Sequence, residues 1–247
     1  MESTMMIEED ELRSGMDVAL ELNNEGALCL SSDEEEEFVV ECFSDALENL
    51  KRFVLHEAVS DPERACEHAT NFKINGLECS PLFSWPCHGD VDPSSHRLYD
   101  RALVISEGSP VTQEIMPLYV CCVLLNTGIA NHRLAIKKNP ALYDKIQELY
   151  QAVTRFLSSS FLRDTPAALA MRVVALNNLA DLYCLRGMYG AAQQTAELLS
   201  TVLAVVRKLH YLNPSNLPVQ LFNVQDLNAI LYNVAMWRNT NVSAPAA

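Results

Sequence analysis

Apolar residues recur every three to four positions over most of the chain, and this spacing predicts a series of helices. The strongest early run lies between Phe38 and Phe53, and a weaker one spans Met16 to Leu30. The motif Asp164-Thr165-Pro166 has a capping residue followed by proline in the first turn, which is typical of a helix start. Later helices are expected at about residues 113–133, 140–156, 166–185, 189–211 and 227–237.

The pattern changes between residues 60 and 96, where four of the eleven prolines lie. We interpret this stretch as a loop insertion. The next residues, RLYDRALVISEGSP, are ambiguous, and we favour an extended segment with a short strand at LVIS. The chain is expected to begin with a disordered acidic N-terminus (1–14), followed by a first hairpin (15–58) and the loop insertion (59–112). Two more hairpins (113–212), a capping helix (213–238) and a disordered tail (239–247) complete the expected organisation.

Three stretches of the chain share a pattern, namely LELNNEGALCL, VLLNTGIANHRL and VALNNLADLYCL. In each, an asparagine is followed closely by a small residue (Gly26, Gly128 or Ala180), then by a turn and a second helix. A small residue at this place allows the second helix of a hairpin to pack closely against the first. Repetition of such hairpins is the signature of a stacked helical array.

The third unit resembles the tetratricopeptide repeat (TPR): a Leu-Ala pair precedes Tyr183, the turn residue Gly187, Tyr189 and Ala192. It departs from that pattern at Ala196, where an aromatic residue is usual, and the other two units are more degenerate. The resemblance covers roughly 17–57 and 113–211. It implies an all-α fold, a right-handed superhelix of about three TPR-like antiparallel hairpins with a C-terminal capping helix. The long insertion, which can hold one short strand, would separate the first and second hairpins.

The resemblance also implies a protein-interaction module that binds a partner's protein or peptide segment in a concave groove. Polar residues on the first helix of each hairpin are the candidates for that groove: Asn23, Asn126, Arg133, Asn177 and Asp181. The repeated asparagines, which include Asn24 and Asn178, have a second interpretation, as groups that hydrogen-bond neighbouring helices and fix the stacking. Both interpretations stay open on sequence alone.

The insertion raises the alternative of a zinc-stabilised regulatory domain, since it concentrates potential ligands. These are Cys66, His68, Cys79, Cys87, His88 and His96. They lack the closely paired cysteines of common zinc sites, so we expect no metal and no cofactor. An enzyme is a further alternative, but no nucleophile, phosphate-binding or metalloprotease motif is present, and we expect a protein without catalytic activity or small-molecule substrate.

Net charge is −14, and it is unevenly distributed. Residues 1–50 hold 16 acidic residues and one basic residue, and the rest of the chain has a net charge of +1. Because a nucleic-acid interface needs a dense basic face, we expect no nucleic-acid partner. The longest apolar run, LYVCCVLL, is too short to span a membrane, and no secretory signal is visible, so we expect a cytoplasmic protein with reduced cysteines.

The acidic run SSDEEEEF at 31–38 lies where the first hairpin needs its turn. Ser31, Ser32 or Asp33 is expected to cap the second helix, and the acids after it would favour the helix N-terminus electrostatically. Ser31 and Ser32 each precede a glutamate by three residues, so they are also candidates for acidophilic phosphorylation.

Overall fold

A computed structural model of the chain describes residues 2–32, 35–60, 83–84, 98–106, 115–159, 165–212, 222 and 224–239. The described part is mostly α-helical, which confirms the all-α class. Its helices are α1 (Glu2–Ser31), α2 (Glu36–Ser60), α4 (Met116–Lys137), α5 (Tyr143–Ser159), α6 (Pro166–Leu185), α7 (Tyr189–Leu212) and α8 (Val224–Asn239), with a 3-10 turn η1 at Pro140–Leu142. Two short strands, β1 (Phe83–Ser84) and β2 (Val104–Ile105), complete it.

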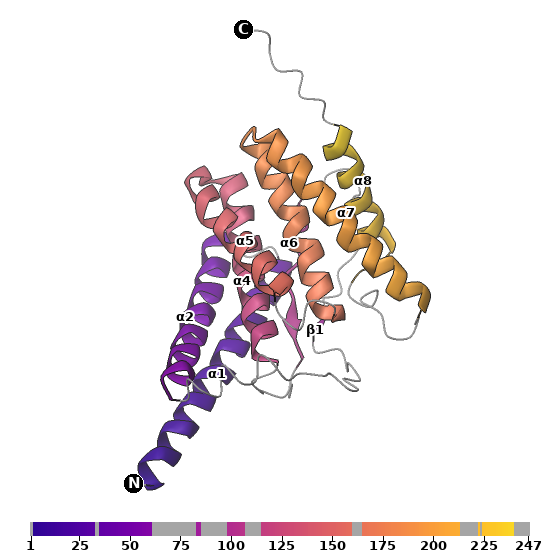
Figure 1. Cartoon of the computed structure of the whole chain (residues 1–247). Coiled ribbons are helices and arrows are strands. Elements are labelled where there is room, and N and C mark those ends of the chain that lie inside the picture. The colour runs from indigo at the N-terminus through magenta and orange to yellow at the C-terminus, as the bar shows by residue number, and fades with distance from the viewer. Residues whose placement is uncertain are drawn as a thin grey trace.

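Consecutive helices pack as pairs: α1 with α2, α4 with α5, and α6 with α7. The first helix of each pair also contacts its counterpart in the next, since α4 packs against both α1 and α6, and α6 packs against α8 (Figure 1). The second helix of each pair packs against the first helix of the next one. The helices therefore form two layers, with α1, α4, α6 and α8 in one and α2, α5 and α7 in the other.

The helix boundaries follow the sequence signals. Thr165 caps α6, because its hydroxyl oxygen accepts a hydrogen bond from the backbone N–H of Ala168 at 3.3 Å. Gly187 ends the turn after α6 with a positive φ of 72°, a conformation that glycine adopts without a steric penalty. At the N-terminus, α1 begins at Glu2.

Small residues set the spacing inside the first two hairpins. A Cβ atom on Gly26 would lie 2.9 Å from the ring of Phe43, and one on Gly128 would lie 2.8 Å from the ring of Tyr150. Both distances are shorter than van der Waals contact. The aromatic ring of the second helix thus occupies the space that glycine leaves on the first, as the repeat pattern predicts.

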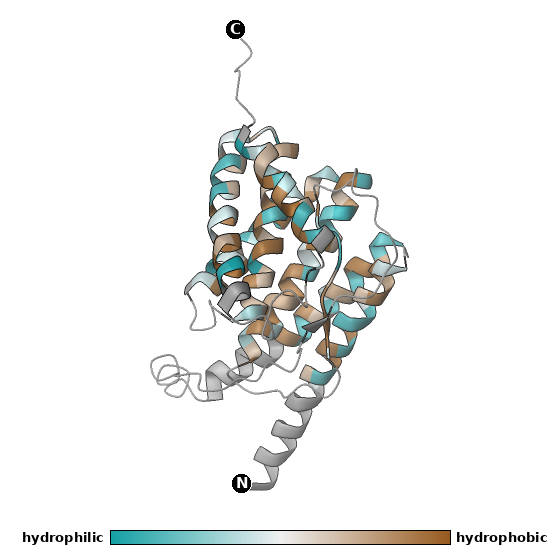
Figure 2. Ribbon diagram, turned by 90° about the vertical axis from the view of Figure 1, so that its right-hand side faces the viewer, coloured by the Kyte–Doolittle hydropathy of each residue, from teal (hydrophilic) through white to brown (hydrophobic). Residues whose placement is uncertain are grey.

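The core is formed by apolar helix faces that meet between the layers (Figure 2). Helix α6 is long and apolar enough to cross a membrane by length and composition, but 83% of its most hydrophobic window is buried within the fold. The core helix of a folded domain meets the same criteria. Its apolar character is therefore explained by packing against α4, α5, α7 and α8.

The acidic turn joins two hairpins. Glu36 and Glu37, in the first turn of α2, form ion pairs with Lys137 and Lys138, respectively, at the end of α4. The hydrogen bond from Lys137 holds the pKa of Glu36 below its usual value. The expectation that a serine caps α2 is wrong for Ser31 and Ser32, whose hydroxyls donate to the carbonyls of Ala27 and Leu28 at the end of α1. Asp33 lies outside the described residues.

Candidate functional site

The site is built on an extended segment, residues 98–106, that crosses the layer formed by α1, α4 and α6. Its strand β2 pairs antiparallel with β1, with Phe83 opposite Ile105 and Ser84 opposite Val104. The expectation of an extended segment with a short strand is therefore confirmed. In extended backbone the N–H and C=O of one residue point to the same side, and alternate residues repeat that direction.

Three asparagines, which we call the asparagine ladder (Asn24, Asn126 and Asn178), bind this backbone. Each uses its carboxamide in the same manner: the side-chain oxygen accepts the N–H of one residue, and the side-chain nitrogen donates to the C=O of that residue. Asn24 binds Ile105 at 2.8 and 2.7 Å, Asn126 binds Leu103 at 2.8 and 2.8 Å, and Asn178 binds Tyr99 at 2.8 and 2.8 Å. Each carboxamide therefore replaces the neighbouring strand of a sheet.

The ladder positions are equivalent in the repeat. Each ladder asparagine lies two residues before the small residue of its unit, which is Gly26, Gly128 or Ala180. The common register explains why the three side chains reach the same face of the helical layer. The residues that the ladder binds, 99, 103 and 105, are all odd-numbered positions of one extended segment, so their backbone N–H and C=O groups point to the same side.

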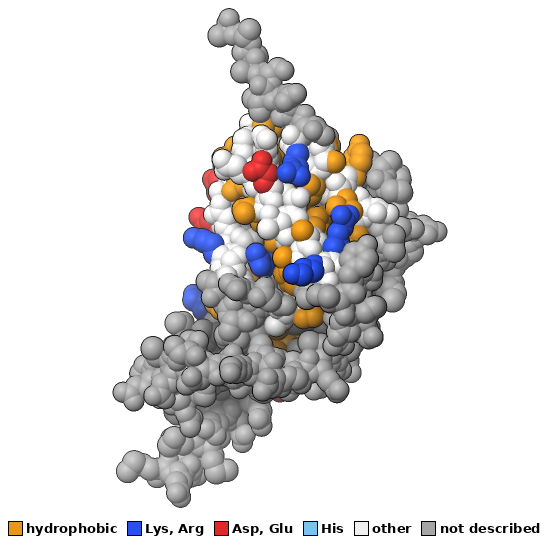
Figure 3. Space-filling view, turned by 45° about the vertical axis from the view of Figure 1, so that its right-hand side comes forward, with side chains coloured by type: hydrophobic (Ala, Val, Ile, Leu, Met, Phe, Trp, Pro, Cys, Tyr) orange, Lys and Arg blue, Asp and Glu red, His pale blue; other side chains and the backbone are white. Residues whose placement is uncertain are grey.

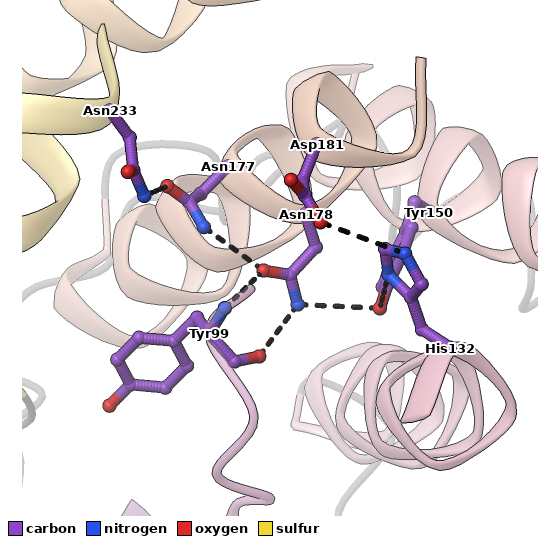
Figure 4. Close-up of polar contacts among 7 residues, drawn as sticks. All are labelled: Tyr99, His132, Tyr150, Asn177, Asn178, Asp181 and Asn233. Carbon is purple, nitrogen blue, oxygen red and sulfur yellow. Dashed lines mark hydrogen bonds and ion pairs between the residues drawn. The ribbon is translucent and has the colours of Figure 1, made fainter. Parts of the chain in front are cut away.

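Two further asparagines support the ladder. Asn23 accepts a hydrogen bond from Asn126 at 2.8 Å and donates to the carbonyl of Leu103 at 3.2 Å. Asn177 donates to Asn178 at 3.1 Å and accepts from Asn233 of α8 at 3.0 Å (Figure 4). These side chains are at most 1% exposed. Their hydrogen bonds hold the carboxamides of Asn126 and Asn178 in the orientation that binds backbone.

A chain of polar groups continues from Asn178 into the core (Figure 4). Asn178 donates to the hydroxyl of Tyr150 at 3.3 Å, and that hydroxyl lies 3.4 Å from Nδ1 of His132. Because the Asn178 nitrogen is a donor, the Tyr150 hydroxyl is free to donate to Nδ1. The His132 proton then sits on Nε2, which faces the Asp181 carboxylate at 3.9 Å.

Burial controls the protonation of this cluster. It lowers the pKa of His132 to about 3, so the ring is neutral at pH 7 despite the nearby Asp181 carboxylate. At 3.9 Å that contact is also too long for a hydrogen bond. Burial raises the pKa of Tyr150 above its ordinary value. His132 and Tyr150 are therefore both uncharged, and they link α4, α5 and α6.

The same end of the segment, near Tyr99, is also held by charge. Arg101 forms an ion pair with Asp226 of α8, whose side chain is 6% exposed. The Arg101 guanidinium also lies 5.6 Å from the centre of the Tyr99 ring, and that ring meets Phe222 edge-on at 5.8 Å. Tyr99, Arg101 and Asp226 therefore form one cluster at the C-terminal end of the helical layer.

The predicted site residues fall into three places. Asn23 and Asn126 meet each other and the segment, whereas Asn177 donates to Asn178, which binds the segment. Asp181 faces His132 instead of the segment. Arg133 lies apart, and its guanidinium donates to the carbonyl of Leu30 at the end of α1, at 2.9 Å.

The asparagines hydrogen-bond one another across helices, as the second interpretation expects, and they also bind an extended segment of the same chain. The candidates taken from sequence did not include Tyr99, Arg101 and Asp226, and they named Asn23 and Asn177, whereas the structure shows Asn24 and Asn178 bound to both backbone groups of one residue. The fixed distance of two residues to the small residue is the signal that singles out Asn24 and Asn178. The six candidate zinc ligands of the insertion lie outside the described residues.

Within the described residues, no cluster of three or more His, Cys, Asp or Glu side chains could hold a metal ion. Burial raises the pKa of Cys121 to about 12 and that of Cys122 well above 9.0, so neither thiol forms a reactive thiolate at neutral pH. Comparison of the chain with family models, curated proteins and solved structures finds no match.

Proposed function

We propose that this protein is a non-enzymatic interaction module of the TPR-like class, which binds an extended segment of a partner protein across α1, α4 and α6. The observation that carries the proposal is the asparagine ladder, whose three carboxamides each bind the backbone N–H and C=O of one extended residue. Such binding is a side-chain version of strand addition, a general mode of peptide recognition. The paired helices, with glycine facing an aromatic ring, support the repeat assignment.

In this structure the ladder is occupied by residues 98–106 of the same chain. We therefore propose that this segment is an internal ligand and that a partner segment binds by replacing it. In sequence, 37 residues (61–97), which include β1, lie between α2 and the segment, and eight (107–114) lie between the segment and the next described stretch at 115.

Release of the internal segment gives up the burial of Tyr99, Leu103 and Ile105 and the six ladder hydrogen bonds. A partner segment must therefore supply equivalent contacts to replace it.

The charge distribution is compatible with this role. The acidity is concentrated in residues 1–50, at the first hairpin. The face of the molecule in Figure 3 shows Lys and Arg side chains dispersed among apolar and uncharged ones, with little acidic surface in its described part.

The test uses a fluorescent peptide with the sequence of residues 97–107 and the full-length chain carrying Leu103→Ala, which weakens the internal segment. We expect the peptide to bind this variant and to bind the unmodified chain at least tenfold more weakly, because the tethered segment competes. Adding Asn24→Ala to the variant removes two hydrogen bonds and should weaken binding about tenfold.

A matched control is Val153→Ala, which truncates a fully buried side chain of α5 outside the segment. It should lower thermal stability without creating peptide binding. Absence of peptide binding to folded Leu103→Ala protein would refute the exchange. Where exchange is found, peptide-competed affinity purification with the same variant identifies the natural partner.

A further inference from the structure

The asparagine ladder recognises backbone and is therefore indifferent to sequence. Selection among partners must come from side chains of the extended segment that the fold encloses. Four of its side chains are buried, namely Tyr99, Ala102, Leu103 and Ile105, and a fifth, Arg101, forms the ion pair with Asp226. Each of these contacts imposes a different chemical requirement.

The requirement for a cation at position 101 follows from Asp226. Its carboxylate is 6% exposed, and loss of a cationic partner from a carboxylate in such a place is unfavourable. A neutral or acidic residue at position 101 would leave that charge without the guanidinium. The aromatic ring at 99 reinforces the same choice, because the guanidinium lies 5.6 Å from its centre.

The apolar positions impose size limits. Ala102 is 0% exposed, so a larger side chain there would meet packed neighbours. Leu103 and Ile105 are 0% and 1% exposed and belong to the main core, so each needs an apolar side chain of similar volume. Asp100 and Val104 are partly exposed, and although Val104 packs against the core, both positions impose weaker restrictions than the buried ones.

We infer that the partner segment is extended and matches the pattern of residues 99–105. In that order it carries an aromatic residue at 99, a basic residue at 101, a small residue at 102, leucine at 103 and isoleucine or valine at 105, with any residue at 100 and 104. This inference rests on the proposed function, since it names the partner of the same site. Its occupant is a segment of another protein with this pattern, held by the ladder through its backbone and by Asp226 through its basic residue.

The experiment measures fluorescence polarisation of 97–107 peptides with the full-length Leu103→Ala chain. Relative to the unmodified peptide, we expect Arg101→Glu and Ala102→Leu peptides to bind at least thirtyfold more weakly and a Tyr99→Ala peptide about tenfold more weakly. A Val104→Thr peptide, changed at a partly exposed position, should bind within threefold.

Charge exchange separates recognition from a general loss of binding. Adding Asp226→Arg to the chain should restore binding of the Arg101→Glu peptide and weaken that of the unmodified peptide. If Asp226→Arg does not fold, Asp226→Asn with an Arg101→Gln peptide provides the same comparison without introducing a like charge. Failure of both chain variants to alter the preference at position 101 would overturn the inference.

The outcomes distinguish a failure of the proposed function from a failure of the sequence preference. If the unmodified peptide fails to bind, the proposed function fails. If it binds and all altered peptides bind within threefold of it, exchange stands and the sequence preference is overturned. If light scattering shows that the unmodified chain forms a concentration-dependent dimer that the peptide dissociates, the natural occupant is a second copy, which also overturns the inference of a separate partner.

Discussion

Substitution of Asn126 by alanine tests the ladder most directly, because its position is completely buried. Asn126 accepts from the N–H of Leu103 and donates to its carbonyl and to Asn23, each at 2.8 Å. After truncation the Leu103 N–H and the Asn23 oxygen lose this partner. The Leu103 carbonyl retains the longer hydrogen bond from Asn23 at 3.2 Å.

The magnitude follows from burial. Each buried polar group that loses its partner costs about 1–3 kcal/mol, so Asn126→Ala should lower the free energy of unfolding by about 3–4 kcal/mol. The matched variant is Asn24→Ala, which removes the same pair of backbone bonds. Asn24 is partly exposed, so water can reach its former partners, and we expect a loss of about 1 kcal/mol.

Urea unfolding followed by circular dichroism gives the two free energies, and amide hydrogen exchange gives the local effect at Leu103. We expect that amide to lose protection in Asn126→Ala before the helices unfold. The ladder does not hold the segment if Asn126→Ala lowers the free energy of unfolding no more than Asn24→Ala does, or if hydrogen exchange of the Leu103 amide still requires global unfolding. Either result would mean that packing alone holds the segment.

Three other predictions follow from the described contacts. Gly128→Ala should destabilise the fold by about 1–3 kcal/mol through its clash with Tyr150, whereas Gly190→Ala, with no atom within 4 Å of the new Cβ, should be neutral or stabilising by up to about 1 kcal/mol in thermal unfolding. Folding lowers the pKa of His132 to about 3, below its unfolded value. The contribution of the neutral ring to the free energy of unfolding is therefore complete above about pH 6.5 and falls by about 1.4 kcal/mol per pH unit as pH drops from there toward 3. The loss of stability in urea between pH 7.5 and pH 5 should accordingly be smaller in His132→Gln. Thr165→Ala should cost about 1 kcal/mol by removing the α6 cap, and Thr165→Ser should retain most of it, as measured by urea midpoint.

Much of the fold could be predicted from sequence because its signals are local. Helical periodicity identified the long helices, and the Thr165-Pro166 and Gly187 signals identified the ends of α6. The Gly26 and Gly128 positions indicated close hairpin packing, and the structure provides the matching rings of Phe43 and Tyr150. These features depend on neighbours in the chain or on a motif repeated along it.

The capping role assigned to Ser31 and Ser32 failed for a physical reason. A serine near a helix boundary can accept from the next helix or donate to the carbonyls of the one it ends, and both arrangements are local. The structure shows the second arrangement. At the start of α2, Glu36 pairs with Lys137, which lies 101 positions away in the sequence, and no local pattern reveals that contact.

The sequence by itself determined the helices, the hairpin turns and the presence of an asparagine in each repeat. Only the tertiary structure decided what those asparagines bind, because a carboxamide pairs with any extended backbone and leaves no mark in the partner's sequence. The contact between Asn24 and Ile105 joins residues 81 positions apart, and the pair of Arg101 with Asp226 joins residues 125 positions apart. Such pairings arise when the stacked helices bring one face together, and that face exists only after folding.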